Sequence, residues 1–340
     1  MLKKKSIIFI LTILCFGAFE SLIAQEKKKS AYNFNGLLFG DIYYVQKHHL
    51  EDSSQKAGAV IRRVYLTFNA KFNKHWFGRF RLEINQSGEF YNYSFETQIK
   101  DLFIGYKAGK HKILVGRSPT RAFDLIENVW GLRYLTKSTL DLQGVSSRDF
   151  GISANGPLNA KNTFQYRTMI GMGEDFKNDY GDGLKSMLAI TWKPTSKWYV
   201  DAYTEYERLP GHTDRIGLQF FAGYLSEGLR WGIQYTNQYR QDDPGIELVS
   251  GFLITNIYKK IGLIYRFDRL LKPSPRGDGI DYLPFDPTAK ATLLISGIEF
   301  EITKHFFITP NIVFITYDEN DLGRRPESDL LYRLTLFFNF

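Results

Sequence analysis

Apolar and polar side chains alternate along most of the chain. In the stretch RRVYLTFNAKF, Val64, Leu66 and Phe68 share one face of an extended backbone, while Arg63 and Thr67 share the other. The stretches WFGRFRLEIN, RIGLQFFAGY and LRWGIQYTNQYR repeat this pattern. A period of two residues is typical of a β-strand with one apolar and one polar face. The sequence therefore predicts an all-β chain, with sixteen segments of this kind.

The lengths of the connections separate a barrel from a β-sandwich, which alternation alone fits equally well. Every second connection is short: FNKH, AGKHK, PLNAKN, KPTSK, LSEG, YKKIG and ITKH. The connections between them vary and are often long, as at 46–59, 118–147 and 271–287. Short turns on one rim and long loops on the other favour a 16-stranded antiparallel transmembrane β-barrel of the outer membrane, with periplasmic turns and extracellular loops.

Aromatic residues gather near the short turns, as an interfacial girdle requires. Those within a few residues of a turn include Trp76, Trp192, Trp198, Tyr199, Trp231, Phe306 and Phe307. A sandwich has no reason to collect its tryptophans at one rim, so this placement also favours the barrel.

The first 24 residues have the layout of a secretory signal. Lys3, Lys4 and Lys5 precede an apolar run that is too short for a membrane-spanning helix, and Ala24 fits a cleavage site. The only cysteine, Cys15, lies inside this segment. We therefore expect residues 1–24 to be a signal peptide and residues 25–340 to form a single barrel domain without disulfide bonds.

The segment LLYRLTLFFNF at the end of the chain continues the alternation. We expect Tyr332, Leu334, Leu336, Phe338 and Phe340 to face lipid, and Arg333, Thr335 and Asn339 to face the lumen. A last strand must pair with the first to leave no open edge in a membrane. The aromatic Phe340 also resembles the sorting signal that the barrel assembly machinery of Gram-negative bacteria reads.

Composition adds little chemistry of its own. The formal net charge of +8 suggests a preference for anionic partners without indicating nucleic acid. No cofactor or metal is expected, and the sequence contains neither G-x-S-x-G nor H-E-x-x-H, so no enzymatic activity is predicted. The pair His48–His49 lacks further ligands in the sequence pattern. Outer-membrane lipid and lipopolysaccharide are the expected surroundings.

Three stretches resemble the phosphate-selective porin O and P family, especially its members in Bacteroidota. They are RRVYLTFNAKF, DLFIGYK followed by ILVGRSPTRAF, and SRDFGISANG, and the likeness covers roughly residues 34–160. The resemblance implies a 16-stranded, usually trimeric channel for small anionic solutes, including phosphate. The corresponding expectation is passive diffusion of small hydrophilic solutes with a weak anion preference.

The longest loop, residues 118–147, holds aliphatic and aromatic residues whose exposure to water would be unfavourable. We therefore expect this loop to fold into the lumen. Charged rings set the selectivity of pores. The expected anion-facing constriction consists of Arg117, Arg121, Arg133 and Arg148, and the expected lumen wall of Arg63, Lys71, Arg79, Arg81, Arg230 and Arg266. The alternative is that the loop arginines pair with the loop's own acids and fix its shape.

Two other classes of function stay open on these grounds. One is a barrel with a closed lumen that serves binding or adhesion, against which the modest loops argue. The other is a barrel lipase, for which we find no outward set of serine, histidine and carboxylate.

Overall fold

The computed structural model describes residues 31–86, 94–173, 183–208, 214–240, 244–280 and 283–340. The predicted signal peptide, residues 1–24, lies outside the described residues and stays a prediction. Among the described residues, no helix has the length and apolar character needed to cross a membrane.

Sixteen strands of the described chain form one closed barrel in which each strand pairs with its sequence neighbours. They are β1 (Ala31–Lys47), β2 (Lys56–Lys71), β3 (Trp76–Gln86), β4 (Phe95–Ala108), β5 (His111–Pro119), β6 (Arg148–Pro157), β7 (Phe164–Gly171), β8 (Leu184–Trp192), β9 (Trp198–Arg208), β10 (Arg215–Ser226), β11 (Leu229–Arg240), β12 (Ile246–Tyr258), β13 (Ile261–Leu270), β14 (Ala291–Thr303), β15 (Phe306–Tyr317) and β16 (Asp329–Asn339). Within the described residues, four short helical segments lie in the connections: η1 (Glu51–Ser53), α2 (Asp124–Trp130), α3 (Thr139–Leu142) and η3 (Gly277–Gly279). The predicted 16-stranded antiparallel barrel is confirmed.

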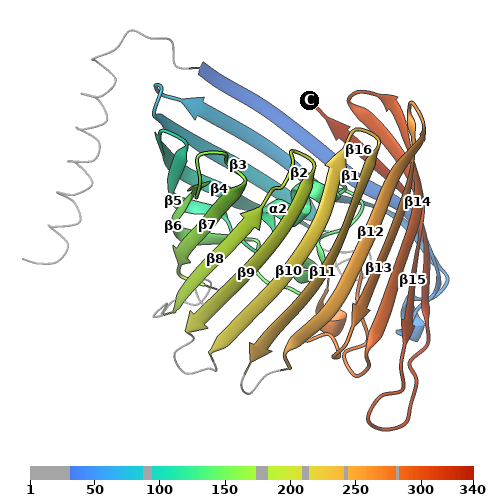
Figure 1. Ribbon diagram of the computed structural model, residues 1–340. Helices are drawn as coiled ribbons and strands as arrows, with labels where there is room; N and C mark the ends of the chain where they lie inside the picture. The colour runs from blue at the N-terminus through green and yellow to red at the C-terminus, as the bar shows by residue number, and fades with distance from the viewer. Residues whose placement is uncertain (1–30, 87–93, 174–182, 209–213, 241–243, 281–282) are drawn as a thin grey trace, which may run out of the picture.

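The barrel closes where β1 meets β16. The two strands run antiparallel from the pair Leu37↔Asn339 to the pair Val45↔Leu331. Beyond β16, the amide of Phe340 donates to the Gly36 carbonyl at 3.0 Å, and the Gly36 amide donates back at 2.9 Å. The final residue is thus hydrogen-bonded into the sheet, and Figure 1 shows it at the same rim as the start of β1.

The two rims differ as predicted. Each connection from an even-numbered strand to the next odd-numbered strand has two to six residues, and these turns lie at the top of Figure 1. The other connections have 5 to 28 residues and start from the lower rim. This asymmetry is the one that outer-membrane barrels show.

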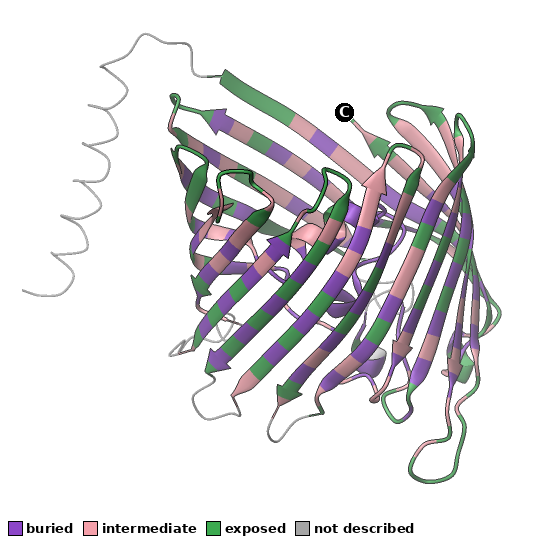
Figure 2. Ribbon diagram, in the orientation of Figure 1, coloured by how far each residue is buried: buried purple, intermediate pink, exposed green. Residues whose placement is uncertain are grey.

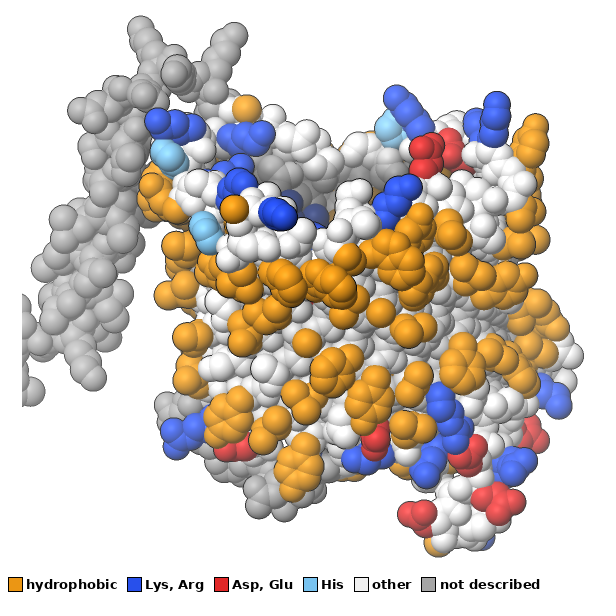
Figure 3. All heavy atoms as spheres, in the orientation of Figure 1, with side chains coloured by type: hydrophobic (Ala, Val, Ile, Leu, Met, Phe, Trp, Pro, Cys, Tyr) orange, Lys and Arg blue, Asp and Glu red, His pale blue; other side chains and the backbone are white. Residues whose placement is uncertain are grey.

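The outside of the barrel carries an apolar belt. Exposed and buried positions alternate along each strand in Figure 2, and hydrophobic side chains form bands around the wall in Figure 3, with most charged side chains above and below them. On β16 the exposed side chains include Tyr332 and Phe338, while Arg333 and Thr335 are buried. A surface of this kind is stable only against lipid.

The aromatic girdle is present at the rim of short turns. The Trp76 and Tyr106 rings lie 4.9 Å apart, and the Trp198 and Trp231 rings 5.3 Å apart. Two members of the predicted set differ in direction. Tyr199 packs against the inner cluster of Ile126, Val129 and Phe221. Phe307 contacts the inward-facing Phe337. Successive side chains of a strand point to opposite faces, so Phe307 faces inward where Phe306 faces outward.

We expect Phe340→Glu to reduce the amount of heat-modifiable barrel in outer-membrane fractions. The substitution places a charge beside Phe34 and Phe338, whose rings lie 6.4 and 5.8 Å from that of Phe340. The loss should exceed what one apolar side chain contributes, about 2 kcal/mol, because the aromatic residue is also expected to be read during assembly.

The matched control is Phe34→Ala, which removes the ring partner and leaves residue 340 intact. Equal losses in the two variants would show that Phe340 acts only through its contacts.

Candidate functional site in the barrel lumen

The third loop, residues 120–147 between β5 and β6, folds into the barrel as predicted. Figure 1 shows α2 enclosed by the strands, and most apolar side chains of the loop are buried. These buried side chains are Phe123, Ile126, Val129, Trp130, Leu132, Tyr134, Leu135, Leu140, Leu142 and Val145. The loop therefore occupies part of the lumen at mid-height instead of extending from the rim.

Helix α2 ends at a glycine that the site requires. Gly131 adopts a left-handed conformation with φ 67°, and its amide donates to the Glu127 carbonyl at 2.8 Å. This arrangement satisfies one of the last carbonyls of the helix. A Cβ at position 131 would overlap the Arg230 guanidinium of the barrel wall. The turn thus brings the third loop into direct contact with β11.

Arg62, which is fully buried, attaches the third loop to the barrel wall. Its Nε lies 2.6 Å from Asp41 Oδ2, and its NH2 donates to Asp41 Oδ1 at 3.0 Å. The same guanidinium donates to the carbonyls of Leu135, at 3.0 Å, and Tyr134. Asp41 also accepts from Thr335 Oγ1 at 2.6 Å. One ion pair therefore joins β1, β2, β16 and the third loop.

Further wall residues hold the loop along its length. Arg266 donates to the Lys137 carbonyl at 2.6 Å while pairing with Asp268. Gln219 donates to the Ala122 carbonyl at 2.9 Å. Because these attachments come from β10 and β13, on other sides of the barrel, the loop is fixed across the lumen.

One side of the lumen is apolar, which the sequence did not predict. The inner faces of β13–β16 and β1 form a cluster with the third loop and with the seventh loop, residues 271–290. The seventh loop contributes Ile280, Leu283 and Phe285, all fully buried, and its Ser274 hydroxyl donates to Gln143 at 2.7 Å. The apolar residues in this connection were the signal that it, too, folds inward.

The neighbouring wall carries a cluster of charges that we call the basic arc. It consists of Arg63, Arg79, Arg81, Lys100, Arg117 and Arg148 on β2–β6. Asp101 lies 2.5 Å from Arg148, 3.4 Å from Arg81 and 3.7 Å from Arg79. Glu83 pairs with Arg63 and, at 2.9 Å, with Lys100. Two carboxylates thus pair with five cationic side chains, which leaves a local excess of positive charge.

In the basic arc, two of the arginine side chains are more exposed to solvent than the carboxylates that pair with the arc. The side chains of Arg79 and Arg81 are 33% and 23% exposed, whereas those of Asp101 and Glu83 are 0% and 1% exposed. The carboxylates lie beneath the guanidinium groups. Cations therefore form the exposed surface of this wall, and the buried acids hold them in place.

Two cationic residues of the inner wall do not follow the period-two pattern of their strands. Alternation places Arg62 and Lys100 on the lipid side, but each lies at an irregularity in strand pairing. Phe39 pairs with Arg63 whereas Asp41 pairs with Val60, and Arg81 pairs with Asp101 whereas Leu82 pairs with Ile99. An extra residue at a bulge turns a side chain to the other face. Both cations therefore point inward.

The four arginines of the predicted constriction fall into different settings. Arg117 donates to the Lys100 carbonyl at 3.3 Å, and Arg148 pairs with Asp101. Arg121 is 4% exposed, pairs with Asp124 at 3.2 Å, and has its pKa lowered to about 10 by burial and by Arg167. Arg121 therefore lies beneath the loop and not on its water-facing surface.

Arg133 pairs with acids of its own loop. It lies 2.7 Å from Asp141 and 3.4 Å from Glu127. Burial opposes the charged forms, but the pairing raises the pKa of Arg133 and lowers that of Asp141 to about 2. For Arg121 and Arg133 the structure has the pairing within the loop that the alternative interpretation described.

The predicted wall residues divide similarly. Arg63, Arg79 and Arg81 belong to the basic arc, and Arg266 holds the third loop. Arg230 lies against Gly131 and forms no ion pair with a described residue. Lys71, the last residue of β2, is exposed at the rim of short turns.

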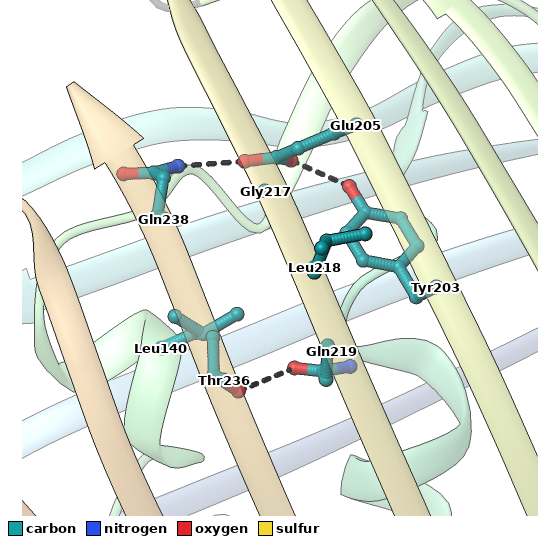
Figure 4. A pocket seen from close by; sticks show the side chains of 8 residues that line it. All are labelled: Leu140, Tyr203, Glu205, Gly217, Leu218, Gln219, Thr236 and Gln238. Carbon is teal, nitrogen blue, oxygen red and sulfur yellow. Dashed lines mark hydrogen bonds between the residues drawn. The ribbon is translucent and has the colours of Figure 1, made fainter. Parts of the chain in front are cut away.

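The wall from β7 to β10 is electrically balanced. Arg167 pairs with Asp201 at 2.8 Å, and Lys185 lies 3.0 Å from Glu205 and 3.4 Å from Glu207. Figure 4 shows Tyr203 and Gln238 donating to Glu205, at 2.5 and 2.6 Å, beside a cavity of about 10 Å³. That volume holds about one water molecule. This side braces the wall without giving the lumen a net charge.

Known structures supply the remaining comparison. No protein-family model matches the chain, and no curated protein matches it either. An anion-selective porin from Comamonas acidovorans has a similar structure, with a TM-score of 0.67 at 15% identity over 92% of this chain and 100% of that one. The chain has the fold of outer-membrane porins.

Two further solved structures are similar. OmpF of Salmonella typhi, in complex with daunomycin, has a TM-score of 0.66 at 11% identity over 91% of this chain and 97% of that one. A trimer form of OmpT from Vibrio cholerae has 0.59 at 13%, over 92% and 100%. Identities this low establish the fold alone, so the phosphate-selective family stays a prediction.

We expect Arg62→Ala to lower the free energy of unfolding by about 3–5 kcal/mol, since it leaves the Asp41 carboxylate buried without its cation. The measurement is urea unfolding of the refolded barrel in detergent, followed by heat modifiability. The exposed Lys71→Ala serves as the control and should leave unfolding unchanged.

Adding Asp41→Ala to Arg62→Ala should cost much less than the sum of the two single losses, because no buried charge then remains unpaired. Additive losses would contradict the role of this pair as the attachment of the third loop.

Proposed function

We propose that the chain is an outer-membrane porin through which small hydrophilic solutes diffuse passively, with a weak preference for anions. The observation that carries the proposal is the unequal exposure of the basic arc, whose guanidinium groups face the lumen above buried carboxylates. Figure 3 shows a hollow at the rim of short turns, with Lys and Arg side chains around it. No catalytic role is proposed for any residue.

The preference follows from the field of the basic arc. Fixed positive charge beside a low-dielectric wall raises the local concentration of anions and repels cations. Glu127 and Asp141 of the third loop oppose this field, since each pairs with Arg133. Most cations of the arc are also held by a carboxylate or a carbonyl. We therefore propose a graded anion preference and no dedicated phosphate site.

A homotrimer fits the shape of the wall. Strands β5–β8 have 8 to 10 residues, whereas β1 and β2 have 17 and 16. A wall that is short for the bilayer can be matched by association with neighbouring copies. We propose that β5–β8 face such copies, and that lipid and lipopolysaccharide surround the rest after insertion by the barrel assembly machinery.

The selectivity test replaces Arg79 and Arg81 together by Gln. Both glutamines can keep a hydrogen bond, to Asn69 and Thr67 respectively, where Arg79 Nε and Arg81 Nε now donate at 2.8 Å. In planar bilayers with a salt gradient, the wild type should show a modest anion preference. The reversal potential of the double variant should move toward cations, most clearly at low salt, where the screening length is longest.

The matched control is Arg325→Gln, which removes a charge from the exposed connection 318–328. It should leave the reversal potential unchanged. An unchanged potential in the Arg79/Arg81 variant would mean that the arc does not set selectivity. A wild type that inserts but conducts no current would favour the closed-lumen binding barrel instead.

A further inference from the structure

Four side chains meet at the rim of the long connections, where β1 pairs with β16 and the barrel closes. His48 and His49 directly follow β1, Tyr317 is the last residue of β15, and Asp329 is the first residue of β16. Strand pairing brings them together, because Lys47 pairs with Leu330 and Ile315 with Asp329. His49 and Asp329 are 280 positions apart in the sequence, so local spacing could not associate them.

The cluster is compact and buried. One ring nitrogen of each histidine and one carboxylate oxygen of Asp329 all lie within 4.8 Å of one another. His49 Nδ1 is 2.9 Å from Asp329 Oδ1, and the two imidazole rings stack with centroids 4.3 Å apart. His48 and Asp329 are 1% and 0% exposed. Side chains this polar are seldom gathered inside a protein without a binding or bracing role.

We propose that His48, His49 and Asp329 form a site for a divalent transition-metal ion of the zinc class. Imidazole nitrogens and a carboxylate oxygen are the donors that Zn²⁺ takes in sites with three protein ligands and one water. Imidazole binds a metal ion through an unprotonated ring nitrogen, so the His49 nitrogen that coordinates the ion carries no proton in the loaded site.

The surroundings already orient the three ligands. Tyr317 donates its hydroxyl proton to Asp329 Oδ2 at 2.5 Å, and the His49 amide donates to Oδ1 at 2.6 Å. The His48 amide donates to Ser54 Oγ at 3.0 Å, which shapes the loop after β1. Outer contacts of this kind fix ligand orientation in metal sites.

Binding also has a cost. The Leu50 amide now donates to His48 Nδ1 at 3.0 Å, and the His49–Asp329 hydrogen bond must give way to coordination. Because these bonds are exchanged for metal bonds, we expect binding weaker than at a site whose ligands have no other partner.

An ion here would join the end of β1 to the start of β16. It would stabilise the closing pair of strands from the loop side, opposite the hydrogen bonds of Gly36 and Phe340. Any ligand that binds the folded state alone raises resistance to unfolding. The proposal is independent of ion selectivity, because the cluster lies at the rim and not on the basic arc.

The test is calorimetric titration of the chelator-treated barrel in detergent with Zn²⁺. We expect one ion per chain, and binding at least tenfold weaker in Asp329→Asn and His49→Ala. The matched control is His111→Ala, which changes the first residue of β5 at the opposite rim, and it should bind as the wild type does. Zn²⁺ should also raise the unfolding temperature of the wild type and of His111→Ala only.

Asp329→Asn keeps the size of the side chain and can still accept from Tyr317, so heat modifiability should show a folded barrel. Absence of stoichiometric binding in the wild type would overturn the proposal and leave a hydrogen-bonded latch. The same conclusion would follow if both ligand variants bound Zn²⁺ as tightly as the wild type.

Discussion

A sheet that spans a membrane can have no free edge, and the rest of this structure depends on that constraint. Lipid offers no hydrogen bonds to exposed backbone groups, so β1 must pair with β16. Closure places Ala31 and Phe340 at the rim of short turns, and it brings the loop after β1 against the start of β16. An apolar aromatic residue at position 340 then forms part of the wall.

Closure also creates an interior. The chain fills part of this interior with apolar loops and lines another part with charged side chains. The third and seventh loops pack against the apolar inner faces of β13–β16 and β1, while the inner faces of β2–β6 keep their charges. The Arg62–Asp41 pair lies at the boundary of these two regions and holds the third loop to both. The apolar packing thus fills the side of the lumen that β13–β16 and β1 enclose.

The regular features could be predicted from sequence, because they repeat locally. Alternation gave the strands, the lengths of the connections gave the two rims, and the apolar content of residues 118–147 indicated an inward loop. Positions at which regularity breaks could not be predicted. Arg62 and Lys100 face inward only because bulges shift the pairing, and Asp329 reaches His49 only through closure of the barrel. The inward seventh loop was within reach of the same apolar argument.

The most direct test of the account places single cysteines on β2 and compares anionic with cationic thiol reagents. Cys15, the only cysteine, lies in the predicted signal peptide, so the background is clean. Asn69 contacts Arg79 inside the lumen, whereas its neighbour Phe68 is exposed on the lipid side. Asn69→Cys should react, and faster with the anionic reagent, while Phe68→Cys should stay unreactive toward both. A faster reaction with the cationic reagent, or none at Asn69→Cys, would contradict a lumen that is open along a positively charged wall.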